Sequence, residues 1–175
     1  MNILITGGAG FIGSHIVDSM NKLRHCVSIV DNLSTGNMSN VNKRAQFHNI
    51  DICRADLKKV FREEKPDIVM HYAANTMVSR SMEKPAWDAR QNILGSINLI
   101  ILCARFNMKR IIYASSAAIY GITISAPLPR RRISLFLIRW QTYCILRAAP
   151  RMCPYARVSL PFPEGRNTFG GLFRQ

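Results

Sequence analysis

The chain has 175 residues, a length that suits one domain and little more. Hydrophobic residues make up 48% of the sequence, so the chain can bury a core and its composition excludes wholesale disorder. The longest apolar runs, residues 97–104 and 133–138, are far shorter than the roughly 20 residues that cross a bilayer. Residues 1–13 lack the basic start and the cleavage site of a signal peptide. We therefore expect a cytoplasmic protein without a membrane span.

The net charge of +14 is unevenly distributed and divides the chain near Gly121. Residues 1–121 hold 15 Lys and Arg against 9 Asp and Glu, whereas residues 122–175 hold 9 Arg, no Lys and one acid. Six of the eight prolines also lie in the second part. We predict a folded domain over residues 1–121 and a basic Arg/Pro-rich tail of irregular structure over residues 122–175. The tail raises a nucleic-acid hypothesis, but no helix-turn-helix or RNA-binding signature supports it.

The spacing of the cysteines argues against a metal site. The five cysteines are odd in number and widely spaced, and the sequence holds no Cys-x-x-Cys pair. We interpret them as thiols of a protein that works in a reducing compartment, and we expect no metal ion.

Strand-like and helix-like segments alternate along the first region. Apolar, β-branched runs predict five strands over residues 2–6, 26–30, 45–50, 67–72 and 110–114. Helical spacing of apolar residues predicts helices over residues 11–23, 55–64 and 85–106, and the Asn-, Ser- and Gly-rich residues 32–42 predict a loop. In the third helix we place the following residues toward the core: Ile93, Ile97, Ile100, Ile101 and Ala104.

This alternation predicts an α/β fold with a Rossmann-like, doubly wound parallel sheet. Strands that are apolar along their whole length fit a parallel sheet, which is buried on both faces. Right-handed crossovers favour the strand order 3-2-1-4-5. With about five strands, the sheet is incomplete compared with full folds of this type.

A glycine-rich turn, TGGAGFIG at residues 6–13, follows the first predicted strand and opens the first predicted helix. Gly7, Gly10 and Gly13 fit a turn in which backbone approaches a pyrophosphate closely and the helix packs tightly on the sheet. The N–H groups at the start of the helix would then face the phosphates. The alternative is a glycine-rich turn that binds nothing.

Asp31 ends the second predicted strand, where a dinucleotide site places an acid that accepts hydrogen bonds from the adenosine ribose. Its carboxylate would repel a 2′-phosphate, and the neighbouring Asn32 offers no positive charge to attract one. The pair therefore predicts NAD rather than NADP as cofactor. The alternative is a surface aspartate that caps a turn.

Seven short motifs together carry a family resemblance. They are TGGAGFIG, DNLSTG from Asp31, Asp51-Ile52, HYAA from His71, Ser81-x-x-x-Pro85, Asn92-x-x-Gly95 and SSAAIYG from Ser115. In this order they resemble the extended short-chain dehydrogenase/reductase family, and within it most of all the UDP-glucose 4-epimerases and related nucleotide-sugar epimerases and dehydratases. The resemblance covers residues 1–121 and implies NAD as cofactor and a UDP-sugar as substrate. It also implies a homodimer of the family type.

The resemblance implies roles at matching positions. Phe11 and Ile12 would line the pyrophosphate turn, Asp31 and Asn32 would bind the adenosine ribose, and Asp51 and Ile52 would contact adenine. Tyr72, Ala73, Ala74 and Asn92 would line the rest of the cofactor cleft, and Ser116 would be the catalytic hydroxyl on the sugar. By residue type alone, Phe11, Ile12 and Ile52 suit a core equally well, His71 suits a packed strand residue, and Ser116 suits a turn cap.

The general base of the family is absent from its expected place. Members use a Tyr-x-x-x-Lys pair past the serine, but this sequence has no lysine after Lys109. Tyr143 and Arg147 stand at about the right distance, although Arg does not replace Lys conservatively. The residues of a substrate domain are also absent. We hypothesise that a disrupted reading frame joins an authentic N-terminal part to unrelated sequence after Gly121; the alternative is a genuine divergent tail.

Three functional interpretations follow. The first is an inactive fragment of a UDP-glucose 4-epimerase-like enzyme, whether epimerase or dehydratase. The second is a non-catalytic NAD-binding module. The third and least favoured is a basic nucleic-acid-binding protein built on the arginine tail.

Overall fold

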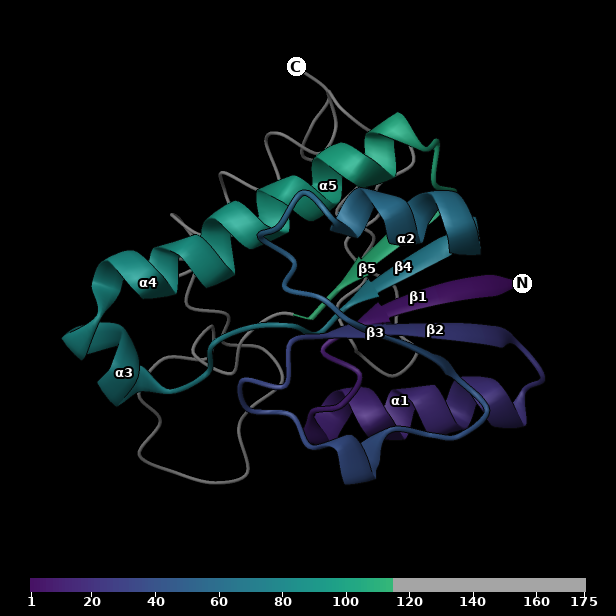
Figure 1. Ribbon diagram of the computed structural model, residues 1–175, viewed down its shortest axis with the longest axis horizontal. Coiled ribbons are helices and arrows are strands. Elements are labelled where there is room, and N and C mark those ends of the chain that lie inside the picture. Colours follow the sequence, from purple (N-terminus) through teal and green to yellow (C-terminus); the bar gives the residue numbers. More distant parts are fainter. Residues whose placement is uncertain (115–175) are drawn as a thin grey trace, which may run out of the picture.

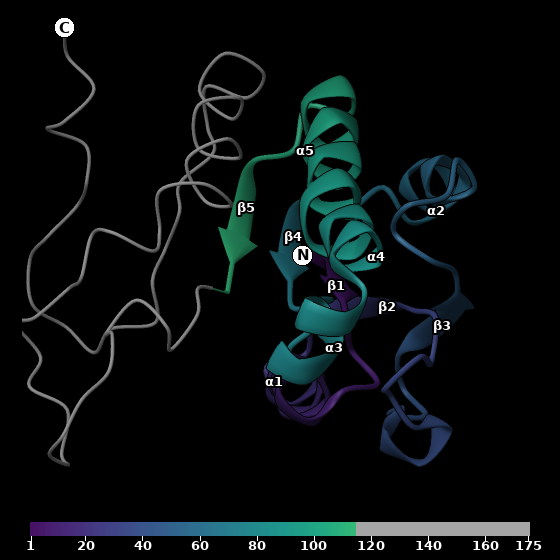
Figure 2. The same ribbon diagram turned by 90° about the vertical axis from the view of Figure 1, so that its left-hand side faces the viewer.

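A computed structural model describes residues 1–114 of the chain. Within this part, five strands form one parallel sheet in the order β3-β2-β1-β4-β5, which confirms the predicted fold class and strand order. The strands are β1 (Asn2–Thr6), β2 (Cys26–Asp31), β3 (Gln46–Asn49), β4 (Ile68–His71) and β5 (Arg110–Tyr113). Figure 2 shows β5 at one edge of the sheet and β3 at the other, with β1 in the middle.

Helices cover both faces of the sheet, as a doubly wound fold requires (Figure 1). On one face lies α1 (Phe11–Lys22), and on the other lie α2 (Leu57–Glu64) and α5 (Gly95–Arg105). Two short helices, α3 (Val78–Glu83) and α4 (Pro85–Ala89), lie beyond the carboxyl ends of the strands. A short 3-10 helix spans Met38–Asn40. No helix within residues 1–114 is long and apolar enough to cross a membrane.

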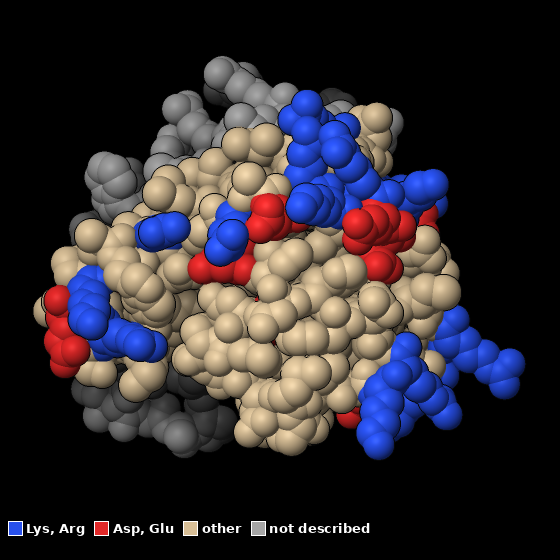
Figure 3. Space-filling model, in the orientation of Figure 1, with Lys and Arg blue, Asp and Glu red and all other residues tan. Residues whose placement is uncertain are grey.

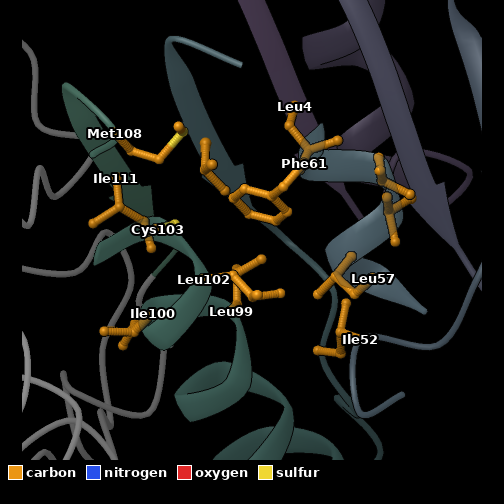
Figure 4. Close-up of a cluster of buried hydrophobic side chains, with 13 residues drawn as sticks. Leu4, Ile52, Leu57, Phe61, Leu99, Ile100, Leu102, Cys103, Met108 and Ile111 are labelled. Atoms are coloured by element: carbon orange, nitrogen blue, oxygen red, sulfur yellow. The ribbon is translucent and has the colours of Figure 1, made fainter. Parts of the chain in front are cut away.

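Burial on both sheet faces explains why the central strands are apolar throughout. Ile3 and Ile5 of β1 pack toward α1, while Leu4 between them packs toward α2 and α5. The cluster on the α2 and α5 face, drawn in Figure 4, includes Phe61 and Leu99, both almost fully buried. Alternate residues of one strand thus belong to two hydrophobic cores, one on each face of the sheet. A strand with one polar face would leave one of these cores incomplete.

The predicted helix over residues 85–106 is interrupted. A π-helical turn, Arg90–Leu94, separates α4 from α5, and the additional helix α3 precedes them. Ile100 is buried as predicted, but Ile101 is 44% exposed, and Leu99, Leu102 and Cys103 take the core positions instead. Residues 99–104 are apolar without interruption, so their periodicity cannot say which side of the helix meets the sheet.

One aspartate fastens the amino-terminal edge of the sheet. Asp67, just before β4, accepts a hydrogen bond from the backbone N–H of Asn2 at 2.9 Å and one from Lys109 Nζ at 2.5 Å. The Lys109 ammonium and the Asn2 N–H lower the pKa of this half-buried carboxyl. The contacts join the starts of β1, β4 and β5 at the edge opposite to the glycine turn.

A buried chain of hydrogen bonds links β1, β4 and α5. Thr6 Oγ1 lies 2.6 Å from His71 Nδ1, and His71 Nε2 lies 2.9 Å from Ser96 Oγ. Since Ser96 Oγ donates its proton to the Asn92 carbonyl at 2.7 Å, it accepts from His71 Nε2–H. His71 Nδ1 then accepts from the Thr6 hydroxyl, which fixes the neutral Nε2–H tautomer. His71 is therefore the packed strand residue that its apolar surroundings suggested.

Stability should depend on pH through His71. Burial lowers the pKa of His71 from 6.5 to about 4. Between these two pH values the histidine is protonated in the unfolded chain and neutral in the folded chain. The free energy of unfolding should be fully retained above pH 6.5 and fall by ~2 kcal/mol between pH 7.5 and pH 5 from this group. Urea denaturation at several pH values measures it.

The contribution of His71 is isolated by comparing variants. His71→Leu should be less stable at pH 7.5 and should lose this part of the pH dependence. His15→Gln, which changes an exposed histidine of α1, should keep the wild-type profile. Identical pH profiles for His71→Leu and the wild type would show that the histidine is not held neutral.

Candidate functional site

The glycine turn at the end of β1 is closed by contacts that exclude side chains. Gly7 has a φ of +73°, and a Cβ there would lie 2.6 Å from the backbone N of Ala73 beyond β4. A Cβ on Gly13 would lie 2.1 Å from the carbonyl oxygen of Gly7, so α1 starts directly against the turn. The Gly7 N–H donates to the Val30 carbonyl at 2.8 Å, which holds the turn on β2. Glycine is thus required at Gly7 and Gly13 by packing alone.

Gly10 differs because space is open above it. A Cβ on Gly10 would approach only the Gly7 carbonyl oxygen, at 3.2 Å. Gly10 is also the N-cap of α1, where no side chain caps the helix and no acid lies in the first turn. The start of α1 therefore keeps N–H donors and a partial positive charge next to an accessible backbone, an arrangement that suits phosphate.

Phe11 and Ile12 do not belong to the core. Their side chains are 80% and 61% exposed, and the Phe11 ring packs edge-on against His15 at 5.1 Å. Phe11 and Ile12 contribute backbone N–H groups rather than side chains to the glycine turn, because they form the first turn of α1. This excludes the core interpretation that their residue types suggested.

Asp31 joins the glycine turn to the loop after β2. The residue is 8% exposed, and its carboxylate accepts hydrogen bonds from the backbone N–H groups of Ala9, at 3.0 Å, and Leu33, at 2.8 Å. A carboxylate offers about four lone-pair positions, so two remain for a ligand. Asp31 is thus a structural link as well as a candidate ribose acceptor. It caps the turn at Leu33, as the alternative interpretation proposed, but it does so from a buried position rather than at the surface.

The loop after β2 is held on the same turn by residues that sequence reasoning missed. The Ala9 carbonyl accepts from the Asn37 N–H at 3.1 Å and from Asn40 Nδ2 at 3.0 Å. A Cβ on Gly36 would lie 2.9 Å from Ala9 Cβ, so this glycine permits the close approach. Asn32 is exposed at the start of the loop, where its Oδ1 accepts from the Ser34 N–H. Gly36 closes the DNLSTG motif, whereas the polar composition of the loop was the only sequence signal for Asn37 and Asn40.

Asp51 and Ile52 follow β3 at the same edge of the sheet but differ in burial. Burial alone would raise the pKa of Asp51, but hydrogen bonds from Cys53, Gln91 and Asn32 outweigh it and lower that pKa. The half-buried carboxylate accepts from the Cys53 N–H at 2.8 Å. Ile52 is 5% exposed and packs in the core on the α2 and α5 face, so packing accounts for its side chain.

Tyr72, Ala73 and Ala74 continue from β4 toward the same edge. Tyr72 and Ala73 are half-buried, and Ala74 is exposed. Burial raises the pKa of Tyr72, which keeps its hydroxyl protonated. The Ala73 N–H donates to Thr6 Oγ1 at 3.3 Å, so the segment is tied to β1 as it passes the glycine turn.

Asn92 lies in the π-helical turn and is bound to the loop after β4. Its Oδ1 accepts from the Asn75 N–H at 2.8 Å, and its Nδ2 donates to the Asn75 carbonyl and to Asp88 Oδ1, both at 3.0 Å. Asn75, Ser81 and Asp88 complete this network and were not singled out from the sequence. Within the described residues, no group of three or more His, Cys, Asp or Glu is arranged to hold a metal ion.

The structure thus brings twelve of the predicted cofactor residues to one edge of the sheet, around the glycine turn, and buries the side chain of Ile52. They are Gly7, Gly10, Phe11, Ile12, Gly13, Asp31, Asn32, Asp51, Tyr72, Ala73, Ala74 and Asn92. Ser116, Tyr143 and Arg147 lie outside the described residues.

Charges of both signs share the face drawn in Figure 3. Basic side chains gather over α2, where acidic ones lie beside them. Among the basic ones, Arg105 and Arg62 lower the pKa of the exposed Lys58. This mixture does not resemble the continuous basic stripe of a nucleic-acid-binding surface.

Comparison with known proteins agrees with the geometry. The family model described as NAD dependent epimerase/dehydratase family matches residues 3–134. UDP-glucose 4-epimerases of Lactobacillus helveticus and Caenorhabditis elegans are 40% and 36% identical to the chain over 73% and 75% of its length. The matches cover only 39% and 42% of those relatives, so the chain spans about two fifths of their length.

Two solved structures share the fold. UDP-glucose 4-epimerase of Thermotoga maritima, solved with UDP-glucose, superposes with a TM-score of 0.78 at 33% identity, over 91% of this chain and 54% of that one. The enzyme of Thermus thermophilus, solved with NAD, gives a TM-score of 0.76 at 32% identity, with the same coverage. With the glycine turn and the family match in agreement, the chain belongs to the NAD-dependent epimerase/dehydratase family.

Proposed function

We propose that this chain binds NAD at the carboxyl edge of its sheet, as the cofactor-binding part of a UDP-glucose 4-epimerase-like protein. One observation carries the proposal: the open backbone at Gly10 meets the uncapped start of α1 while the Asp31 carboxylate lies beside the same turn. A dinucleotide needs this combination of phosphate donors and ribose acceptor. The NAD complex of the Thermus thermophilus relative supports the choice of ligand.

Each group has a defined part in binding. The N–H groups of Phe11 and Ile12 would donate to the pyrophosphate above Gly10, with Gly7 and Gly13 keeping the turn tight. Asp31 would use its remaining lone pairs for the adenosine ribose. NAD, when bound, supplies hydride transfer, and the protein supplies binding and orientation.

The other predicted site residues would contact the rest of the cofactor and the sugar. Asn32 would assist at the adenosine ribose, Asp51 and Ile52 would meet the adenine end, and Tyr72, Ala73, Ala74 and Asn92 would border the other half of the cofactor. Ser116 would hydrogen-bond the hydroxyl of a UDP-sugar, a proposal supported by the UDP-glucose complex of the Thermotoga maritima relative. We propose that the protein works in the cytoplasm, a reducing compartment in which cysteines remain thiols.

A non-catalytic NAD-binding module is the second candidate, and one observation favours it. The sequence has no lysine after Lys109, so no Tyr-x-x-x-Lys pair can follow Ser116. We further propose that the compositional change after Gly121 reflects a disrupted reading frame. Translation of the coding DNA in the other two frames tests this, since a restored Tyr-x-x-x-Lys pair supports the idea and its absence from both frames contradicts it.

Gly10→Val should abolish most NAD binding. The φ of Gly10 is −78°, which any residue adopts, and a Cβ there meets only the Gly7 carbonyl oxygen, at 3.2 Å, so a small shift of that carbonyl accommodates valine. We expect the dissociation constant for NAD to rise at least about tenfold, because the side chain occupies the pyrophosphate position. Titration calorimetry measures it. Ser19→Val, at an exposed position of the same helix, is the control and should bind like the wild type; equal affinity in Gly10→Val would rule out this site.

The wild type should bind NAD more tightly than NADP, and Asp31→Ala should reduce the ratio of NAD affinity to NADP affinity. The substitution removes both the charge that repels a 2′-phosphate and the ribose acceptor. Because it also removes the acceptor of the Ala9 and Leu33 N–H groups, the affinity ratio is the informative quantity. Asp18→Ala is the control, since Asp18 holds the same loop through Asn42 at 2.6 Å without lying at the ribose. A wild type that prefers NADP contradicts the role of Asp31.

The chain should show no measurable conversion of UDP-glucose to UDP-galactose. A tyrosine with an ordinary pKa of about 10 is a poor base at pH 7, and general-base catalysis contributes roughly 10²–10⁴-fold. A coupled assay on purified protein, with Tyr143→Phe as the paired variant, measures this. Activity that Tyr143→Phe removes would establish Tyr143 as a working base and end the non-catalytic interpretation.

A further inference from the structure

A single buried carboxylate organises the segment beyond β4. Asp88 is 9% exposed, and its Oδ1 accepts three hydrogen bonds: from Asn75 Nδ2 at 2.7 Å, Ser81 Oγ at 2.8 Å and Asn92 Nδ2 at 3.0 Å. The donors belong to three different segments, namely the loop after β4, helix α3 and the π-helical turn. One side chain therefore fixes the relative positions of all three.

The arrangement leaves Asn92 no free donor. Both hydrogens of Asn92 Nδ2 are used within the chain, one on the Asn75 carbonyl and one on Asp88. Its Oδ1 holds the Asn75 N–H. Asn92 thus holds the loop after β4 in place through the backbone of Asn75, and it has no side-chain donor left for a ligand. The π-helical turn that contains Asn92 begins two residues after Asp88, and such turns often mark functional sites.

The loop held in this way borders one half of the proposed cofactor site. It begins at Tyr72 and Ala73, and Ala73 lies against Gly7 of the glycine turn. In a doubly wound sheet the ligand crosses the carboxyl edge where the strand order reverses, between β1 and β4. Since Asp31 places the adenosine half over β2, the half beyond the pyrophosphate extends over β4, toward the loop.

We propose that Asp88 is a positioning residue that shapes the loop of residues 72–77 for the nicotinamide-bearing half of the dinucleotide. This inference rests on the proposed function. Removal of the carboxylate takes away the acceptor that the three donors share in a half-buried site. Ser81 Oγ keeps the Met77 carbonyl at 3.1 Å and Asn75 Nδ2 keeps Ser81 Oγ at 3.2 Å, but no group then joins the loop, α3 and the π-helical turn at one point, so the loop is free to shift. The adenosine half is held by the glycine turn and Asp31, neither of which is bonded to Asp88. The π-helical turn reaches the adenine end only at its periphery, where Gln91 Nε2 donates to Asp51 Oδ2 at 3.4 Å.

The experiment compares NAD with ADP, which contains only the adenosine and pyrophosphate part. Calorimetry on the full chain would use the wild type, Asp88→Ala and Asp88→Asn. Because all three hydrogen bonds converge on Oδ1, asparagine keeps an acceptor oxygen and should retain part of the effect. We expect Asp88→Ala to weaken NAD binding about tenfold, with ADP binding changed less than about twofold, and Asp88→Asn to lie between.

Asp67→Ala is the matched control. It removes a carboxylate that also accepts hydrogen bonds from separate segments, but at the opposite edge of the sheet. It should lower the unfolding temperature and leave the ratio of NAD to ADP affinity unchanged. A merely structural role for Asp88 would give this same pattern.

The outcomes separate the two proposals. A selective loss of NAD affinity in Asp88→Ala, partly rescued in Asp88→Asn, supports the positioning role. Equal losses for NAD and ADP, or no loss for either, overturn it while the NAD-binding proposal stands. If Asp88→Ala does not fold, Asp88→Asn decides between these results. A wild type that binds ADP and NAD with the same affinity overturns the positioning role, and one that binds neither overturns the proposed function as well.

Discussion

The fold of this edge depends on how closely backbone can approach backbone at Gly7. There β1 ends, β4 passes by, and α1 begins, and a side chain on Gly7 would lie 2.6 Å from the Ala73 nitrogen. The positive φ of Gly7 and the missing Cβ of Gly13 let the chain reverse direction within one short turn. Because the start of α1 then lies at the switch point of the sheet, its N–H groups face the place where a doubly wound fold binds its ligand.

Around the glycine turn the buried side chains are polar, whereas those between the sheet and its helices are apolar. The two clusters beneath the helices are built from aliphatic and aromatic side chains. At the carboxyl edge, Asp31, His71 and Asp88 are buried instead, and each is hydrogen-bonded to at least two partners. Polar groups buried in this way are costly unless they are satisfied, so the edge is fixed by specific bonds rather than by volume.

The three networks have different parts in holding that edge. Asp31 fastens the loop after β2 to the turn, and the chain from Thr6 through His71 to Ser96 ties β1 and β4 to α5. Asp88 fastens the segment beyond β4. The parallel strands form the platform, and these hydrogen bonds determine the position of each loop above it. A dinucleotide that crosses from β2 to β4 would lie against the loops that these bonds position.

The sequence alone determined the strands, their order and the glycine turn, because these depend on local patterns. Continuous β-branched runs specify strands buried on both faces, and TGGAGFIG combines the end of a strand, a tight turn and the start of a helix in eight letters. The predicted strands agree with the observed ones to within one residue at every end. Asp31 was also identifiable, since it ends a strand at a fixed distance from the turn.

Only the tertiary structure decided which faces and partners those residues acquire. Ile101 looked as suitable for the core as Leu99, because the run from Leu99 to Ala104 is apolar on every side, and packing against the sheet selected one face. Phe11 and Ile12 are apolar by type yet exposed, since the turn needs their backbone at the edge. Asp88 and Asn75 gave no signal, because their role comes from bonds between segments separated by 13 residues in sequence and joined by the fold. Local sequence patterns predict the helices and strands, whereas the roles of the buried polar residues depend on contacts between segments that only the fold brings together.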